Sequence, residues 1–173
     1  KGSSQIKHGP YTIGGALNLH STKIPLQFSA FGQGSYGSFG MNQERFWVGE
    51  TKGQLSYLFE LNRVAATGFK QLDGGGNTGF DRRDYLGKIR WQSASKAKVQ
   101  QSLQLKILHT EEQSNETYLG LTYSDFIANP LRRYAGTQKD QLNLWHNHLI
   151  LQHVLRPLKN LQISSSAYLT KTF

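Results

Sequence analysis

The sequence predicts an all-β protein whose strands form an antiparallel meander. Three observations support this fold class. Apolar and polar residues alternate with a period of two in several segments, whereas the 3.6-residue period of a helix is almost absent. The alternating segments are long, and short turn-forming stretches connect some of them. The remaining connections are long and polar or rich in glycine. We therefore expect about seven strands after residue 25.

Four segments alternate clearly and three less so. The clear ones are residues 54–62, 84–92, 99–107 and 161–170, and the others are 26–35, 43–51 and 141–155. Within 54–62 the apolar set is Leu55, Tyr57, Phe59 and Leu61, and the polar set is Ser56, Glu60 and Asn62. Successive side chains of a strand lie on opposite faces, so the two sets should point to opposite sides of the sheet. One short helical turn is expected at 124–128, ahead of Asn129 and Pro130.

Short and long connections alternate along most of the chain. The short ones are residues 52–53, 93–98 and 156–160, and the long ones are 67–82 and 111–139. Short turns at one end of a meander and long loops at the other are typical of outer-membrane β-barrels. The expected strands also exceed the length of about five or six residues that is commonest in soluble sheets. These features predict a transmembrane β-barrel wall.

Composition excludes several classes of protein. The chain has 173 residues, a formal net charge of +9 and no cysteine. Sites built on cysteine, such as zinc fingers, iron–sulfur centres and catalytic thiols, are therefore excluded. The chain contains no run of roughly 18 consecutive apolar residues, which a membrane-spanning helix needs. We find no catalytic constellation, so we expect no enzyme activity, no resident cofactor and no metal site. The positive charge indicates an anionic partner.

A segment rich in turn formers, residues 6–25, lies ahead of the expected strands. It contains Gly9, Pro10, Gly14, Gly15 and Asn18. With Thr22, these residues resemble the Tyr-Gly-Pro-x-x-x-Gly-Gly-x-x-Asn-x-x-Thr pattern at the end of the plug domain in TonB-dependent outer-membrane receptors. His8 stands where that pattern has Tyr, and Thr22 lies one place later than its commonest spacing. The glycines would let the backbone approach closely where the plug meets the barrel wall.

A second resemblance covers residues 116–134, which are similar to an extracellular loop of the receptor branch that includes ferric citrate transporters. The two resemblances together imply that residues 1–25 are the C-terminal end of a plug domain. Residues 26–173 would then be the N-terminal strands of the barrel. Barrels of this family close at about 22 strands, so the resemblance implies that this chain is a fragment, a partial barrel of about seven strands.

The resemblance also implies a function, a location and a set of partners. It implies active uptake of a ferric chelate, either ferric citrate or a siderophore, across the outer membrane of a Gram-negative bacterium. The chelate is the transported ligand. Energy would come from the TonB complex acting through the plug, and the barrel would contact outer-membrane lipid and lipopolysaccharide. No nucleic acid is expected as a partner.

The candidate binding residues lie in the longest predicted loop. They are Arg132, Arg133, Tyr134 and Lys139. Guanidinium groups bind carboxylates through two parallel hydrogen bonds, and a tyrosine adds a hydroxyl group and an apolar ring. Ferric citrate and many ferric siderophores are anions. We therefore expect this stretch to bind the chelate at the extracellular end of the barrel.

Two other functions fit parts of the sequence. The chain has about the right length for a complete eight-stranded outer-membrane barrel with a structural or adhesion role. A soluble β-protein that binds nucleic acid would account for the charge of +9. However, the basic residues are scattered from Lys1 to Lys171 and do not form one patch.

Overall fold

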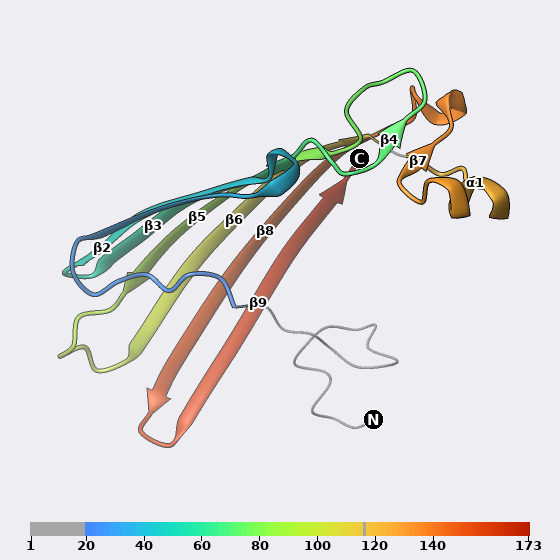
Figure 1. The fold of residues 1–173 in the computed structure, drawn as a ribbon. Helices are drawn as coiled ribbons and strands as arrows, with labels where there is room; N and C mark the ends of the chain where they lie inside the picture. The colour runs from blue at the N-terminus through green and yellow to red at the C-terminus, as the bar shows by residue number, and fades with distance from the viewer. Residues whose placement is uncertain (1–19, 116) are drawn as a thin grey trace.

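The computed structural model describes residues 20–115 and 117–173, which form one open antiparallel sheet of seven strands (Figure 1). The sheet strands are β1 (Ser29–Tyr36), β2 (Asn42–Lys52), β3 (Leu55–Ala66), β5 (Phe80–Gln92), β6 (Gln100–Asn115), β8 (Gln141–Leu158) and β9 (Leu161–Thr172). Each pairs with its neighbours in chain order. The prediction of an all-β antiparallel meander with seven long strands is confirmed. Strands β1 and β9 form the two edges.

Strand β3 shows why the alternation predicted the sheet so well. Along residues 55–60 exposed and buried positions alternate without a break. Tyr57 and Phe59 are exposed on one face, whereas Ser56 and Leu58 are almost completely buried on the other. This is the division predicted for residues 54–62. A slip of one residue in the pairing would exchange the two sets, so the pattern fixes the register.

One face of the sheet carries a continuous row of apolar residues, one from each strand. The pairing places these directly beside one another: Ala30, Val48, Phe59, Gly87, Ile107, Leu149 and Leu169. The row next to it contains Tyr57, Ile89, Leu105, Leu151 and Ala167 from strands β3 to β9. We call this the apolar face. Its large side chains are exposed, among them Phe59, Ile107 and Leu169.

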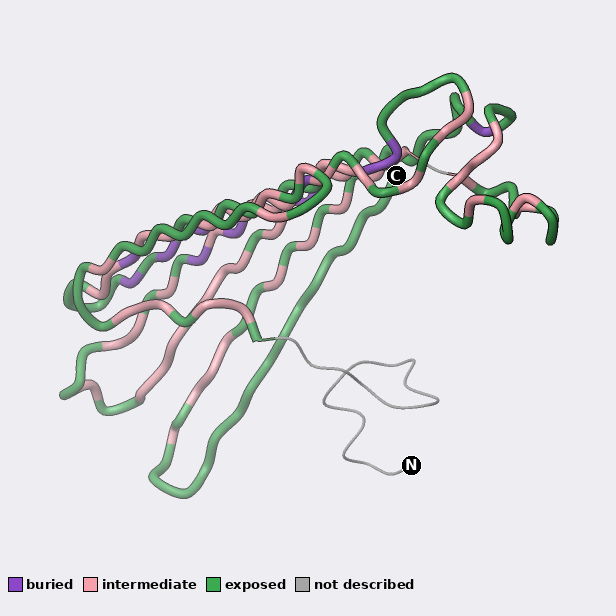
Figure 2. Tube along the Cα trace, in the orientation of Figure 1, coloured by how far each residue is buried: buried purple, intermediate pink, exposed green. Residues whose placement is uncertain are grey.

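The opposite face is polar. One of its rows consists of Arg45, Asn62, Asp84, Thr110, His146 and Thr172. The members bond to one another, since Thr110 Oγ1 donates to Asp84 Oδ1 at 2.7 Å. Five of the sheet's buried side chains, Ser56, Leu58, Glu60, Leu86 and Lys88, belong to this face as well. By contrast, β9 is exposed along its whole length (Figure 2).

The segment ahead of β1 crosses the polar face (Figure 1). Arg45 Nη2 donates to Thr22 Oγ1 at 2.8 Å, and Lys88 Nζ donates to the carbonyl oxygen of Thr22. Pro25 lies so close to Gly49 that an added Cβ would be 2.8 Å from the proline ring. The same Cβ would lie 2.7 Å from the carbonyl oxygen of Tyr57, so a residue larger than glycine would have to displace this segment, the neighbouring strand, or both.

The connections divide between the two ends of the sheet as predicted. The turns at 53–54, 93–99 and 159–160 lie at one end, and the long loops 67–79 and 116–140 lie at the other (Figure 1). Gly53, with φ +61°, takes the left-handed conformation of the tight turn between β2 and β3. The short link between β1 and β2, which includes the 3-10 turn η2 (Ser38–Gly40), is at the long-loop end. No helix in the described residues is long and apolar enough to span a membrane.

Candidate functional site

The two long loops meet at one end of the sheet and carry the predicted binding residues. Loop 67–79 contains strand β4 (Gln71–Leu72), and loop 116–140 contains β7 (Arg132–Arg133). These strands pair in parallel and form a second, two-stranded sheet. The amide of Asp73 adds a 2.8 Å hydrogen bond to the carbonyl oxygen of Arg133. The pairing joins two loops that are separated by β5 and β6 in the chain.

Helix α1 (Tyr123–Ala128) lies in the second loop, where the sequence predicts a helical turn. Thr122 caps its first turn, because Thr122 Oγ1 accepts a hydrogen bond from the amide of Asp125. Asn129 ends the helix and donates a 2.8 Å hydrogen bond to the side chain of Gln71. Since Gln71 belongs to β4, the end of the helix is attached to the other loop.

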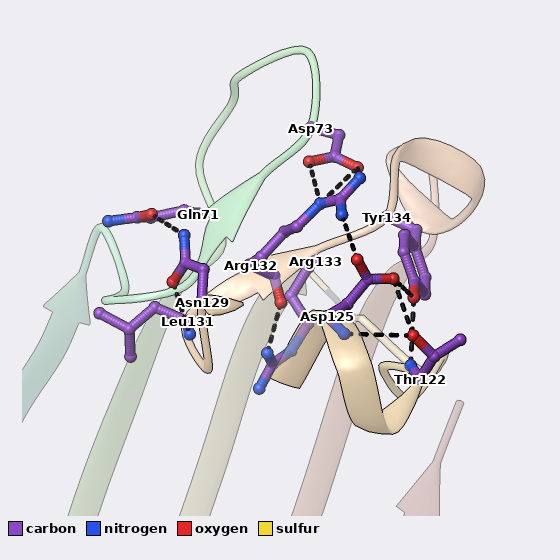
Figure 3. Close-up of polar contacts among 9 residues, drawn as sticks. All are labelled: Gln71, Asp73, Thr122, Asp125, Asn129, Leu131, Arg132, Arg133 and Tyr134. Carbon is purple, nitrogen blue, oxygen red and sulfur yellow. Dashed lines mark hydrogen bonds and ion pairs between the residues drawn. The ribbon is translucent and has the colours of Figure 1, made fainter. Parts of the chain in front are cut away.

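Arg132 lies at the centre of a charged cluster on one side of β7 (Figure 3). Its Nε and Nη2 donate to the two oxygens of Asp73 at 2.9 and 3.0 Å, and its Nη1 donates to Asp125 Oδ1 at 2.8 Å. The Tyr134 hydroxyl donates to Asp125 Oδ2, and its ring lies 5.2 Å from the Arg132 guanidinium. We call Asp73, Asp125, Arg132 and Tyr134 the Arg132 cluster.

Two members of the Arg132 cluster, Asp125 and Arg132, are favoured in their ionised forms. The hydrogen bond from Tyr134 lowers the pKa of Asp125, and the bond from Thr122 and the charge of Arg132 act in the same direction. The hydrogen bond to Asp73 raises the pKa of Arg132. Two carboxylates already neutralise this guanidinium, so an incoming anion would have to displace one of them. Arg132 and Tyr134, both predicted to bind the ligand, thus have partners within the loops.

Arg133 leaves β7 on the side opposite to Arg132 (Figure 3), as successive residues of a strand do. Its Nη1 donates to the carbonyl oxygens of Pro130 and Arg132 at 3.0 and 2.6 Å. Within residues 20–115 and 117–173 it forms no ion pair. The two adjacent arginines, equivalent in the sequence, therefore differ in what neutralises their charge.

Of the remaining predicted site residues, the structure describes Lys139 alone. Lys139 is exposed in the turn that precedes β8 and contributes no side-chain contact to the Arg132 cluster. The residues of the plug-end motif, Gly9, Pro10, Gly14, Gly15 and Asn18, lie outside the described residues.

A recess of about 490 Å³ lies against Arg133. Its lining includes Lys70, Tyr118, Tyr123, Phe126, Pro130 and Arg133. Sequence reasoning missed Lys70, which comes from the first loop. No spacing in the sequence connects Lys70 to Arg133, because contacts between the folded loops, such as the pairing of β4 with β7, bring them together. The described residues contain no group of three or more potential metal ligands placed to hold an ion.

Comparison of the chain with protein-family models, curated proteins and solved structures found no match.

Proposed function

We propose that this chain is a segment of a TonB-dependent outer-membrane receptor that takes up an anionic ferric chelate. The division of the sheet into an apolar and a polar face carries the proposal. On the apolar face, an uninterrupted apolar row crosses all seven strands. Barrel strands in a bilayer need this arrangement, because one face meets lipid and the other a polar interior.

The exposure of the apolar face supports a lipid environment. Ile89 is 55% exposed, Leu169 is 68% exposed and Phe59 is 45% exposed. Soluble monomers rarely expose contiguous apolar patches of more than a few hundred Å². Contact with lipid hydrocarbon chains would remove these side chains from water and so avoid the unfavourable free energy of exposing them. The long loops at one end and short turns at the other agree with the same environment.

The loop end supports an anionic ligand. Arg133 and Lys70 both line the recess, and the whole chain has a net charge of +9. Positive charge around a concave site raises the local concentration of anions. In this proposal the ferric chelate is cargo, bound and carried without any bond being made or broken. The TonB complex supplies the energy through the plug, and lipid and lipopolysaccharide surround the wall.

Uptake of radioactive iron by whole cells tests this proposal. A strain deleted for the complete gene is compared with the same strain carrying the gene on a plasmid, using ferric citrate and a panel of ferric siderophores. We expect gene-dependent uptake of at least one anionic chelate, abolished by an uncoupler of the inner-membrane proton gradient. Uptake that does not depend on the gene for any chelate would contradict the proposal, as would transport that persists with the uncoupler.

A further inference from the structure

The recess beside Arg133 differs in charge from the Arg132 cluster on the other side of β7. Lys70 Nζ donates a 2.7 Å hydrogen bond to Thr117 Oγ1, and Arg133 bonds only backbone oxygens. In the part of the chain that the structure describes, neither cation has a carboxylate partner. Two positive charges therefore line one recess, and no carboxylate of residues 20–115 and 117–173 pairs with either of them. An anion that enters it would interact with both charges and would displace no carboxylate of the described residues.

Arg133 keeps a pair of donors that can bind a carboxylate. Only its Nη1 is used, so the edge formed by Nε and Nη2 has no partner in the described residues. The same edge binds a carboxylate elsewhere in this molecule. Arg132 uses Nε and Nη2 on Asp73, and Arg63 uses them on Asp81. Paired donors of this kind favour two oxygens of one anionic group.

Aromatic side chains form much of the remaining lining. Tyr118 is 71% exposed, Tyr123 is 82% exposed and Phe126 is 52% exposed. Helix α1 carries Tyr123 and Phe126, and its attachment through Thr122 and Asn129 holds both rings beside Arg133. Exposed rings around a concave site offer flat apolar surfaces on which another ring can stack. The recess thus combines cations with stacking surfaces.

The geometry points to an aromatic anion, one with a carboxylate group or a phenolate oxygen attached directly to a ring, as the group that this recess binds. Arg133 and Lys70 hold the oxygens, and Tyr118, Tyr123 and Phe126 contact the ring. The volume of about 490 Å³ lies within the range of roughly 300–1,000 Å³ that is usual for small-molecule sites. This inference rests on the proposed function, since it specifies the chemistry of the chelate that the receptor recognises.

Calorimetric titration of the protein, expressed from its complete gene and purified in detergent, tests the inference. The probes are 2,3-dihydroxybenzoate, which has a ring, and citrate, which has none. We expect tighter binding of 2,3-dihydroxybenzoate. Arg133→Ala should weaken it about tenfold or more, Lys70→Ala should weaken it less, and Arg133→Lys should restore only part of the affinity. Lys96→Ala removes an equal charge from the exposed turn at the short-turn end of the sheet and is the control.

A substitution at Phe126 tests what the aromatic lining contributes to binding. Phe126→Leu keeps an apolar side chain but removes the ring, so it should weaken binding of 2,3-dihydroxybenzoate and leave citrate binding unchanged. Citrate bound as tightly as 2,3-dihydroxybenzoate would overturn the inference. So would equal losses in Arg133→Ala and Lys96→Ala, because the effect would then be one of general charge.

Iron-loaded and iron-free probes separate this inference from the proposed function. If iron-free 2,3-dihydroxybenzoate binds in an Arg133-dependent way while cells take up no ferric chelate, the binding inference is supported and the proposed transport function is refuted. If cells carrying Arg133→Ala take up the ferric catecholate at the same rate as wild-type cells, the binding inference is refuted and the proposed transport function is supported.

Discussion

The sheet and the loop end of this molecule are held together in different ways. In the sheet, pairing repeats over many residues, as in the sixteen-residue strand β6, and the same face pattern recurs in every strand. At the loop end, two strands of two residues each and the Arg132 cluster join loops that are distant in sequence. The sheet therefore distributes its stability over many contacts, whereas the loop end depends on a few.

The largest effect should come from a charge on the apolar face. Leu149→Lys places an ammonium group in the apolar row, and Gln152→Lys places the same group on the polar face of the same strand. If the row lies near the bilayer centre, Leu149→Lys should lower the free energy of unfolding in lipid vesicles by about 2–4 kcal/mol. Gln152→Lys should have little effect. Equal effects would contradict a lipid-facing role for this face.

Two glycine substitutions compare the ends of the sheet. A Cβ at Gly79, where loop 67–79 returns to β5, would lie 1.8 Å from the carbonyl oxygen of Ala66. Gly79→Ala should therefore force the loop to move and lower the free energy of unfolding by about 1–3 kcal/mol. At Gly53 a Cβ would meet nothing within 4 Å, so Gly53→Ala should cost only the left-handed backbone strain, about 1 kcal/mol. Urea unfolding in detergent measures both, and the reverse order would be inconsistent with this reasoning.

Removing one charge should loosen the loop end while leaving the sheet intact. Asp73→Asn keeps the size of the side chain but weakens its bonds to Arg132. We expect amide hydrogen exchange in loops 67–79 and 116–140 to rise about two- to fivefold, as expected for a partly exposed ion pair. Exchange in β3 and β5 should stay the same. Asp140→Asn, which changes a carboxylate outside the Arg132 cluster, serves as the control. Faster exchange throughout the sheet would show that the two regions are not independent.

Acid should also loosen the loop end, by protonating Asp125, but less than Asp73→Asn does. The Tyr134 hydrogen bond lowers the pKa of this carboxyl in the folded protein, and its unfolded pKa is about 3.9. Its contribution to stability is therefore fully present above that value and is lost as the pH falls through the lower folded pKa. Hydrogen exchange in loop 116–140, corrected for the intrinsic rate, should rise over this acidic range. The Asp125→Asn variant should lack this dependence, and an unchanged profile in both proteins would refute the assignment.

The sequence was sufficient for the sheet because alternation is clear in the segments of β3, β5, β6 and β9 and partial in those of β1, β2 and β8. It placed the turn between β2 and β3 at 52–53, one residue before the observed 53–54. It missed β4 and β7, since two residues are too few to show a period. It also treated Arg132 and Arg133 as equivalent. Only the direction of each side chain and the positions of Asp73 and Asp125 distinguish them.

Lys70 illustrates a second reason why the site was only partly predicted. The partners of a binding recess can come from loops that are far apart in the chain, and such proximity follows from the assembled sheet. The predicted site contained Arg133, which lines the recess, and Lys139, which does not. The ligand-binding roles of Arg132, Arg133, Tyr134 and Lys139 stay predictions, and the Arg133 variants test one of them.

The pairing of β4 with β7 also has a consequence for the order of folding. Asp73 and Arg132 are 59 residues apart in the sequence, whereas the hairpin of β2 and β3 closes over the two residues of its turn. Closing the longer loop costs more chain entropy until β5 and β6 have brought its ends together. The loop pair should therefore form late, after the transition state. Weakening it would then speed unfolding and leave the refolding rate almost unchanged.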